Sequence, residues 1–416
     1  MRILIANAHR NLVGGVEKYL HALIPGLGSR GYELGLLHEY AAPGDREKID
    51  PPRALSRIWC RTESGTPAAL ESIREWAPDL VYHHGFDLED SVAVEDALLS
   101  AYPVVLYVHN YDRTCGTGQK CFTFPHPEVC QRQIGPMCLV LNYARGCGGK
   151  RPDILWRRFK KHSQSSARLP QFDRICVASA HMQAELANHN VPPGKLQLLP
   201  LPAADHILNS PPERSASTSK ILFVGRLTDL KGVDYLIRAI PEASGKLGRS
   251  LTLVVAGDGP EQKKLAELAR STGVPVDFRG WVGTQLKLDL MQQVDLLAVP
   301  SVWPEPFSLV GVEAGALGLP AVAYATGGIP DWLIPGETGE LAPHDPPTPA
   351  GLAAAIVRAL GSPEHYARLS LGAWQLAARF TLTTHLDRLE QLFESIAMAV
   401  VPVQPAAVAN QDAISR

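Results

Sequence analysis

In this 416-residue chain, the stretch KILFVGRLTDLKGVDYL, residues 220–236, gives the clearest indication of the fold class. It opens with a continuous apolar run that ends near Arg226, and a helix is predicted to start close to Lys231. Short apolar strands that alternate with helices are typical of a parallel sheet covered by helices on both faces. Similar strand-and-loop units follow in SLTLVVAGDG (250–259), VDLLAVPS (294–301) and PAVAYATGG (320–328).

The first half of the chain carries the same alternation. The stretch RILIANA, residues 2–8, is strand-like, and apolar side chains then recur at helical spacing from Val16 to Leu27. Between the halves, SPPERSASTS at residues 210–219 is rich in Pro, Ser and Thr without periodicity, which is typical of a linker. The sequence therefore predicts two α/β halves joined by this linker. Further buried strands are predicted in DLVYHHG (79–85), PVVLYVHN (103–110) and DRICVASA (173–180).

Composition and charge argue against several classes of protein. Lys and Arg number 40 and Asp and Glu 42, a formal net charge of −2, which argues against broad nucleic-acid binding. No apolar run approaches the roughly 18 residues of a membrane span. The short apolar run before Asn7 is also too short for the core of a secretion signal. The chain is therefore expected to be cytoplasmic.

Glycine turns and cations follow the predicted strands, at the sheet edge where parallel α/β proteins bind ligands. Gly14 and Gly15 precede the first helix, where glycines let the backbone approach a ligand and free amides attract an anion. Arg226 and Lys231 are suited to clamp a pyrophosphate, because an Arg fork and a Lys point charge both bind phosphate oxygens. A tight turn and a solvated surface pair are the alternative interpretations.

The stretch PEPFSLVGVEAGALGLPAVA, residues 304–323, holds two carboxylates near the start of one predicted helix. Glu305 and Glu313 are separated by seven residues, and the helix is predicted to begin at or near Ser308. Backbone amides at such an N-terminus can hold phosphate. Because the paired oxygens of a carboxylate accept from vicinal hydroxyls, one Glu is predicted to bind ribose and the other a sugar.

With these motifs in this order, the chain resembles the family 4 retaining glycosyltransferases of the GT-B fold, the glycosyl transferases group 1. The resemblance rests on the Gly14-Gly15 loop, GRLTDLKG, AGDGP, PEPFSLVGVEAGALGLPAVA, TGGIPD and GETGEL. It implies two Rossmann-like domains whose parallel sheets face each other across a cleft, and a C-terminal helix that crosses back to the first domain. The expected parts are an acceptor-binding domain at 1–209, the linker at 210–219, a nucleotide-sugar-binding domain at 220–385, and a crossing-back helix with a flexible tail at 386–416.

Carried over residue by residue, the resemblance implies roles for the candidate site. Arg226 and Lys231 match the diphosphate-binding pair. Glu313 matches the carboxylate that binds ribose, and Glu305 the one that contacts the donor sugar. His109 matches a histidine that faces the donor sugar, and a histidine satisfied inside its own loop is the alternative. The other donor-binding positions implied are Gly14, Gly15, Phe307, Ser308, Leu309 and Val310.

The resemblance also implies the reaction. The donor would be a UDP- or GDP-sugar, no cofactor or metal is required, and a glycan or lipid-linked hydroxyl accepts the sugar. The cationic clamp and the helix amides stabilise the leaving diphosphate. Attack from the same face then retains the anomeric configuration without a carboxylate nucleophile, so the two Glu residues are binding groups more than acid–base catalysts. Synthesis of a cell-surface polysaccharide or lipopolysaccharide is the expected setting, and the oligomeric state is open.

Three other functions are alternatives to this one, and each makes a different demand on the sequence. A GT-B synthase acting on a sugar phosphate or another small acceptor shares the fold, and the cysteine cluster and basic stretch described below argue against it. A catalytically silent GT-B subunit that only binds a partner predicts decay of the nucleotide site, yet the candidate cations and carboxylates are all present. A nicotinamide oxidoreductase is disfavoured because the G-x-G-x-x-G spacing is missing.

A cysteine-rich insertion, residues 115–147, follows His109 and is expected to line the acceptor side. It contains no C-x-x-C pair, so zinc ligands and buried free thiols are both open interpretations. Disulfides would be favoured only in an exported protein. The candidate metal ligands are Cys115, Cys121, Cys130, Cys138 and Cys147.

A basic stretch, KRPDILWRRFKKH at residues 150–162, comes next and interleaves six Lys or Arg residues with Trp156 and Phe159. Such a pattern fits a helix that lies at the inner face of a membrane. A solvated helix face near the cleft is the equally weighted alternative.

Overall fold

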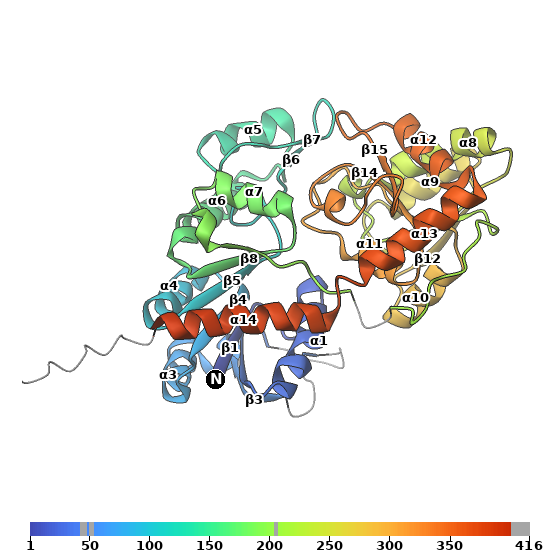
Figure 1. Ribbon diagram of the computed structural model, residues 1–416. Helices are drawn as coiled ribbons and strands as arrows, with labels where there is room; N and C mark the ends of the chain where they lie inside the picture. The colour runs from blue at the N-terminus through green and yellow to red at the C-terminus, as the bar shows by residue number, and fades with distance from the viewer. Residues whose placement is uncertain (42–47, 50–53, 204–206, 401–416) are drawn as a thin grey trace, which may run out of the picture.

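The computed structural model describes residues 1–41, 48–49, 54–203 and 207–400, so the expected tail beyond residue 400 lies outside the described residues. The chain forms two α/β domains, each built on a parallel sheet (Figure 1). None of the described helices combines the length and the apolar composition that crossing a bilayer requires.

The N-terminal sheet has seven parallel strands in the order β3-β2-β1-β4-β5-β8-β9. Strand β1, inside the sheet, is apolar on both faces, because helices cover the sheet on both sides: Ile3, Leu4 and Ile5 are all fully buried. The strands are β1 (Arg2–Asn7), β2 (Glu33–His38), β3 (Leu55–Cys60), β4 (Leu80–Gly85), β5 (Val104–Val108), β8 (Arg174–Val177) and β9 (Leu196–Leu198). The covering helices are α1 (Gly15–Ser29), α2 (Arg61–Ser64), α3 (Thr66–Trp76), α4 (Ser91–Ala101) and α7 (Ala180–Asn188).

The cysteine-rich insertion lies between β5 and β8. It folds as a short antiparallel hairpin of β6 (Cys121–Phe122) and β7 (Glu128–Val129), followed by α5 (Met137–Arg145). The predicted basic stretch then begins α6 (Pro152–Ala167), which packs against α5.

The C-terminal sheet has six strands in the order β12-β11-β10-β13-β14-β15. The strand predicted within residues 220–236 is β10, which lies at the centre between β11 and β13. The strands are β10 (Lys220–Val224), β11 (Thr252–Ala256), β12 (Val276–Gly280), β13 (Leu296–Val299), β14 (Ala321–Tyr324) and β15 (Gly339–Ala342). The helices are α8 (Val233–Leu247), α9 (Gln262–Thr272), α10 (Thr284–Gln292), α11 (Leu309–Ala316), α12 (Pro349–Leu360) and α13 (Pro363–Ala377).

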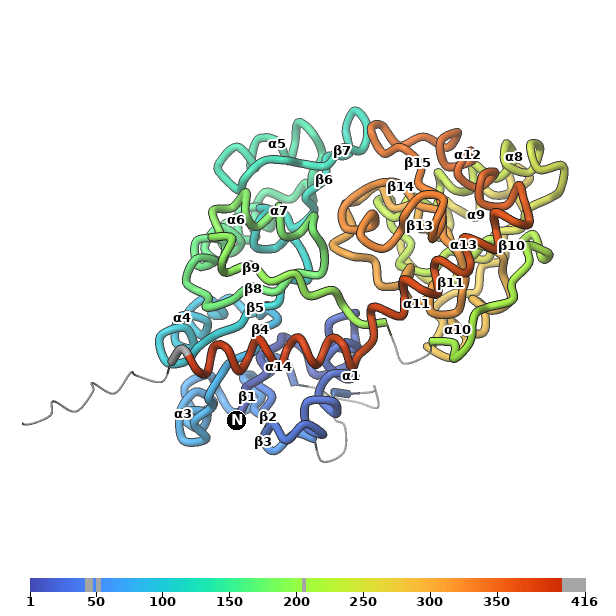
Figure 2. The backbone as a smooth tube through the Cα atoms, viewed as in Figure 1, coloured from blue at the N-terminus to red at the C-terminus, as the bar shows by residue number. Residues whose placement is uncertain are grey.

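The last helix, α14 (Leu382–Val400), crosses back and lies along the N-terminal domain (Figures 1 and 2). Arg30, at the end of α1, makes ion pairs with Asp387 and Glu390 of α14. The crossing helix begins at Leu382, four residues before the expected boundary at 386, and a separate helix, α13, precedes it.

Candidate active site

The loop after β10 brings one of the two predicted phosphate-binding cations next to a predicted carboxylate. Lys231, in the short turn Asp229–Lys231, donates to Glu305 over 2.6 Å. The Glu305 side chain is almost fully buried, whereas that of Lys231 is 29% exposed. Lys231 also lies 5.3 Å from the centre of the Trp303 ring. The ion pair therefore holds the Lys231 ammonium at the open edge of the sheet.

Gly232 is required where this loop enters α8. Its φ of +66° belongs to the left-handed region, and a Cβ there would lie 2.0 Å from the carbonyl oxygen of Pro300. The loop consequently packs directly on the end of β13, and the backbone amide of Val302 donates to Leu230.

Arg226, the other predicted cation, is exposed at the same edge. Within the part of the chain that the structure describes, its guanidinium has no hydrogen bond or ion pair to another side chain. The five donors of this group are thus open to a ligand.

The loop that carries Glu305 is fixed by the glycines that follow β14. Gly328 donates its amide to the carbonyl of Glu305 over 2.7 Å. Gly327 has a φ of +58°, and a Cβ there would lie 2.3 Å from that same carbonyl oxygen. Only glycines fit this close approach, which explains the TGGIPD motif beside the carboxylate.

Helix α11 begins where the sequence predicted, next to the two carboxylates. Ser308 precedes it with a φ of +68°, and the first amides of the helix have no intrahelical acceptor. Phe307 is buried, and its carbonyl accepts from the indole of Trp332 over 2.6 Å. Leu309 and Val310 form the first turn, so the helix presents free amides at the sheet edge.

Glu313, on α11, has a partner that sequence reasoning missed. Lys287 of α10 donates to its Oε1 over 2.6 Å, and both side chains are largely buried. The pairing holds the carboxylate in place and leaves its Oε2 without a described partner.

A cleft of about 1320 Å³ opens at the carboxyl edge of the N-terminal sheet. Leu230, in the turn that ends at Lys231, and Trp303, after β13, extend its lining to the C-terminal domain. Gly14 precedes α1 as predicted, whereas Gly15 is the first residue of the helix, and a Cβ on Gly15 would meet no atom within 4 Å. Gly14 and Gly15 do not themselves line the cleft, but the next residues, Val16 and Glu17, do.

His109 lines this cleft directly after β5. Its ring stacks on Tyr107 with the centres 4.4 Å apart, and its Nε2 lies 2.9 Å from Nδ1 of His84. Burial, with a smaller contribution from His385, lowers the pKa of His109 to about 3. The imidazole is therefore neutral at physiological pH, and hydrogen bonding is the chemistry open to it.

Hydrogen bonds join the two domains beside the Glu305 loop. The Tyr111 hydroxyl donates to the carbonyl of Pro304 over 2.8 Å, and Ser179 donates to that of Pro306 over 2.6 Å. The loop that carries Glu305 is thus held by the N-terminal domain as well as by its own domain.

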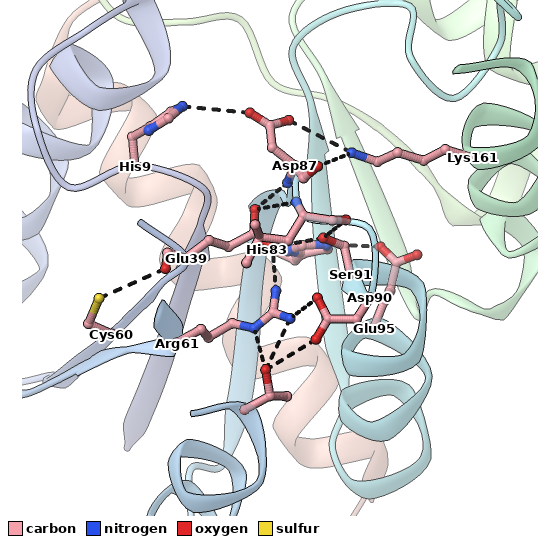
Figure 3. Close-up of polar contacts among 12 residues, drawn as sticks. His9, Glu39, Cys60, Arg61, His83, Asp87, Asp90, Ser91, Glu95 and Lys161 are labelled. Carbon is pink, nitrogen blue, oxygen red and sulfur yellow. Dashed lines mark hydrogen bonds and ion pairs between the residues drawn. The ribbon is translucent and has the colours of Figure 1, made fainter. Parts of the chain in front are cut away.

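A buried ion pair beneath the cleft also escaped sequence reasoning (Figure 3). Glu39, after β2, pairs with Arg61, after β3, and both side chains are almost fully buried. Glu39 also accepts from the amide of Leu88 and the hydroxyl of Ser91, so it fixes the loop between β4 and α4. The same loop places Asp87 between His9 and Lys161 at the rim (Figure 3). The sequence did carry a signal for this pair, because Glu39 and Arg61 each follow the end of a strand.

The five cysteines of the insertion are free thiols. Burial raises the pKa of Cys121 and of Cys147 to about 12, so both are protonated. Among the described residues, no three His, Cys, Asp or Glu side chains are placed to hold a metal ion, so the structure gives the zinc interpretation no support.

Helix α6 turns its cations toward the cleft. Arg157, Arg158, Lys160 and Lys161 all contribute to the lining, whereas Trp156 is 56% exposed outside it. Helix α6 therefore contributes positive charge to the cleft, and both interpretations of the basic stretch stay predictions.

Comparison with known proteins gives two family models that together span most of the chain. The model described as Glycosyltransferase Family 4 matches residues 13–203, and that described as Glycosyl transferases group 1 matches residues 210–373.

Several curated proteins are similar over part of their length. An uncharacterized glycosyltransferase of Methanocaldococcus jannaschii is 41% identical over 111 residues, 26% of this chain and 28% of that protein. The glycogen synthase of Mycobacterium tuberculosis is 35% identical over 192 residues, 45% and 43% of the two chains. A D-inositol 3-phosphate glycosyltransferase of Corynebacterium diphtheriae is 33% identical over 190 residues, 44% and 43%. The matched parts thus span less than half of each of these relatives.

Solved structures share the fold over nearly the whole chain. The Anabaena protein Alr3699/HepE, in complex with UDP, superposes with a TM-score of 0.68 at 20% identity, over 95% of this chain and all of the other. Sucrose-phosphate synthase from Thermosynechococcus elongatus has a TM-score of 0.68 at 20% identity, over 96% and 99%. These matches confirm the fold class predicted from the sequence. With both halves matched by the corresponding family models, the chain belongs to the family 4, group 1 glycosyltransferases of the GT-B fold.

Proposed function

We propose that this protein is a retaining glycosyltransferase. It moves a sugar from a nucleoside-diphospho sugar to a hydroxyl of a glycan or glycolipid, in the synthesis of a cell-surface polysaccharide or lipopolysaccharide. The observation that carries the proposal is the Lys231–Glu305 ion pair just before α11, the helix that carries Glu313. Arg226 is exposed after β10, and a large cleft opens at the edge of the other sheet. The UDP and UDP-glucose complexes of Alr3699/HepE support a nucleotide-sugar donor.

On the donor side, the diphosphate would lie at the α11 N-terminus between Arg226 and Lys231. Negative charge develops on the leaving diphosphate, and cations and amides already in place stabilise it without reorganisation. Lys231 reaches this position because Glu305 holds it.

The two carboxylates act as binding groups in this proposal. Lys287 occupies one oxygen of Glu313, and Lys231 one oxygen of Glu305. The second oxygen of each can accept from a hydroxyl, of ribose for Glu313 and of the donor sugar for Glu305. The ion pair with Lys231 gives Glu305 a positioning and binding role in this proposal, with no covalent intermediate. The acceptor hydroxyl would attack from the face that the diphosphate leaves, so the anomeric configuration is retained.

The cleft beside His109 would hold the acceptor. Its volume of about 1320 Å³ exceeds the roughly 300–1,000 Å³ of typical small-ligand pockets, which supports an acceptor of several sugar units. Polar groups of both signs line it, as hydroxyl-rich ligands require.

A small phosphorylated acceptor is the second candidate, because α6 directs cations into the cleft. Arg158 and Lys160 have no described ion pair, so they are available to bind a phosphate. The likeness in fold to sucrose-phosphate synthase is compatible with this alternative.

Release of nucleoside diphosphate tests the proposal. The purified chain is incubated with UDP-, GDP- and ADP-sugars and two acceptor panels, one of glycans and glycolipids and one of sugar and inositol phosphates. Turnover is expected with the first panel, and turnover with the second alone would favour the alternative. Glu313→Ala should lose most of the activity, whereas Glu242→Ala, an exposed change on α8, should keep it. Undiminished turnover in Glu313→Ala would overturn the proposed site.

The anomeric proton of the product tests retention separately. Its coupling constant in the NMR spectrum should report the same configuration as the donor. An inverted product would refute same-face attack while leaving the donor site standing.

A further inference from the structure

Two histidines from neighbouring strands meet at the floor of the cleft. His84 lies on β4 and His109 directly follows β5, and these strands pair in parallel. Nδ1 of His84 lies 2.9 Å from Nε2 of His109. His84 is only 8% exposed. The contact is therefore a buried hydrogen bond between a structural histidine and the histidine that faces the cleft.

Both rings are held in place by aromatic neighbours. Tyr82 packs edge to face on His84 with the centres 4.3 Å apart, and Tyr107 stacks on His109 at 4.4 Å. The ring of Tyr19 packs near both histidines, with its centre 5.8 Å from that of His84 and 5.9 Å from that of His109. Burial lowers the pKa of each imidazole, so both are neutral. A rigid, neutral pair has one proton to share across the 2.9 Å contact.

The environment of His84 Nε2 decides where that proton lies. Nε2 is buried and has no hydrogen-bond partner among the described residues. If His109 donated from Nε2, His84 would carry its own proton on Nε2, as a buried N–H without an acceptor. Orphaned buried N–H groups are rare because their desolvation is not offset. If His84 donates from Nδ1 instead, only a lone pair is left unpaired.

We propose that His84 is a positioning residue that holds His109 as the Nδ1–H tautomer and presents this N–H to the cleft. His109 Nδ1 makes no described hydrogen bond and is not among the buried unpartnered atoms, so a ligand can reach it. Its ligand class is an oxygen acceptor, a sugar hydroxyl or a phosphate oxygen of the donor. The assignment of that ligand, unlike the tautomer, rests on the proposed function.

The tautomer can be measured in the ligand-free protein. Long-range ¹H–¹⁵N correlation spectra of the ¹⁵N-histidine-labelled chain distinguish a protonated from an unprotonated ring nitrogen. His109→Gln identifies the His109 signals, and His126→Asn, at an exposed position, is the matched control. We expect His109 to be protonated at Nδ1 and unprotonated at Nε2. A proton on Nε2 of His109 would overturn the proposal without any variant of His84.

Variants of His84 test the positioning role. Asn offers an N–H near the place of the imidazole Nδ1, so His84→Asn should preserve the His109 tautomer, whereas His84→Leu should give a mixture. With an active donor and acceptor pair, His84→Leu should lower kcat by about 10- to 100-fold, the range for hydrogen bonds that orient a working histidine, with a smaller change in KM. An unchanged His109 spectrum in His84→Leu would refute the role. Because the spectra need no substrate, failure of the donor screen would not affect this result.

Discussion

The Lys231–Glu305 ion pair should contribute to both the charge and the stability of the proposed donor site. Lys231→Met would leave a buried carboxylate without a partner, which costs about 1–3 kcal/mol of unfolding free energy. The urea-unfolding free energy should fall by that amount, and the double variant with Glu305→Gln should recover part of it. Both the single variant Lys231→Met and the double variant with Glu305→Gln should have lost affinity for the donor. A Lys231→Met protein as stable as wild type would show that the pair does not restrain the loop.

The substitution Arg226→Lys tests whether diphosphate binding needs the bidentate guanidinium of Arg226 or only its positive charge. Arg226→Lys keeps the charge but loses the bidentate geometry, so the affinity for nucleoside diphosphate should drop by roughly 10- to 100-fold. The matched control is Arg279→Lys on β12, where the guanidinium pairs with Asp277. Equal affinities in the two variants would count against a diphosphate site at Arg226.

For single residues, the sequence predicts positions at a ligand-binding edge, but it does not predict the partners of their side chains. Arg226, Lys231 and Glu305 stand in motifs next to strand ends, where a ligand edge is expected. Lys287 lies in a helix without any motif, 26 residues before Glu313, and only packing brings the two together. Glu39 and Arg61 meet for the same reason.

Among the elements, the loop after β14 is the most tightly constrained. Gly327→Ala would place a Cβ 2.3 Å from the carbonyl oxygen of Glu305, at a positive φ, so the unfolding free energy should fall by more than about 1 kcal/mol. Gly245→Ala is the control, because a Cβ near the end of α8 meets nothing within 4 Å. It should stabilise by about 0.5–1 kcal/mol. Equal effects of the two substitutions in chemical denaturation would argue against a close approach at Gly327.

The strands were predictable because parallel strands covered on both faces read as continuous apolar runs. The break between α13 and α14 is less evident, because both helices are amphipathic. A signal was present: the hydroxyl of Thr381 accepts from the amide of Thr384 at the start of α14, a typical helix cap.

For the whole molecule, His385 ties the crossing helix to the N-terminal core. Its Nε2 lies 2.7 Å from the hydroxyl of Tyr19, and its Nδ1 2.9 Å from the carbonyl of Pro200. Burial lowers its pKa to about 4, below the roughly 6.5 of an unfolded chain. Its contribution to stability is therefore complete above pH 6.5 and is lost as the pH falls toward 4, because the unfolded chain then binds the extra proton.

The substitution His385→Gln should therefore change how steeply the unfolding free energy depends on pH. Between pH 6 and 5, the unfolding free energy of wild type should fall more steeply than that of His385→Gln, by up to about 1.4 kcal/mol per pH unit. Urea denaturation at several pH values measures both slopes. Parallel slopes would mean that His385 does not titrate on unfolding.

The resemblance to a known family predicted the two-domain arrangement. It did not predict which residues of the two domains contact each other. Contacts such as that of Tyr111 with Pro304 join residues 193 positions apart, and no local pattern encodes them. The size of the cleft likewise depends on how the insertion folds over the sheet edge.

Calorimetric titration with UDP-, GDP- and ADP-sugars tests most directly that this sheet edge is a nucleotide-sugar site. One nucleotide class should bind wild type with a dissociation constant in roughly the micromolar to millimolar range. The same donor should bind Glu313→Ala at least about tenfold more weakly, since a charge-assisted hydrogen bond is lost. If none of the three classes binds, or if Glu313→Ala binds the donor as tightly as wild type does, this sheet edge is not the nucleotide-sugar site.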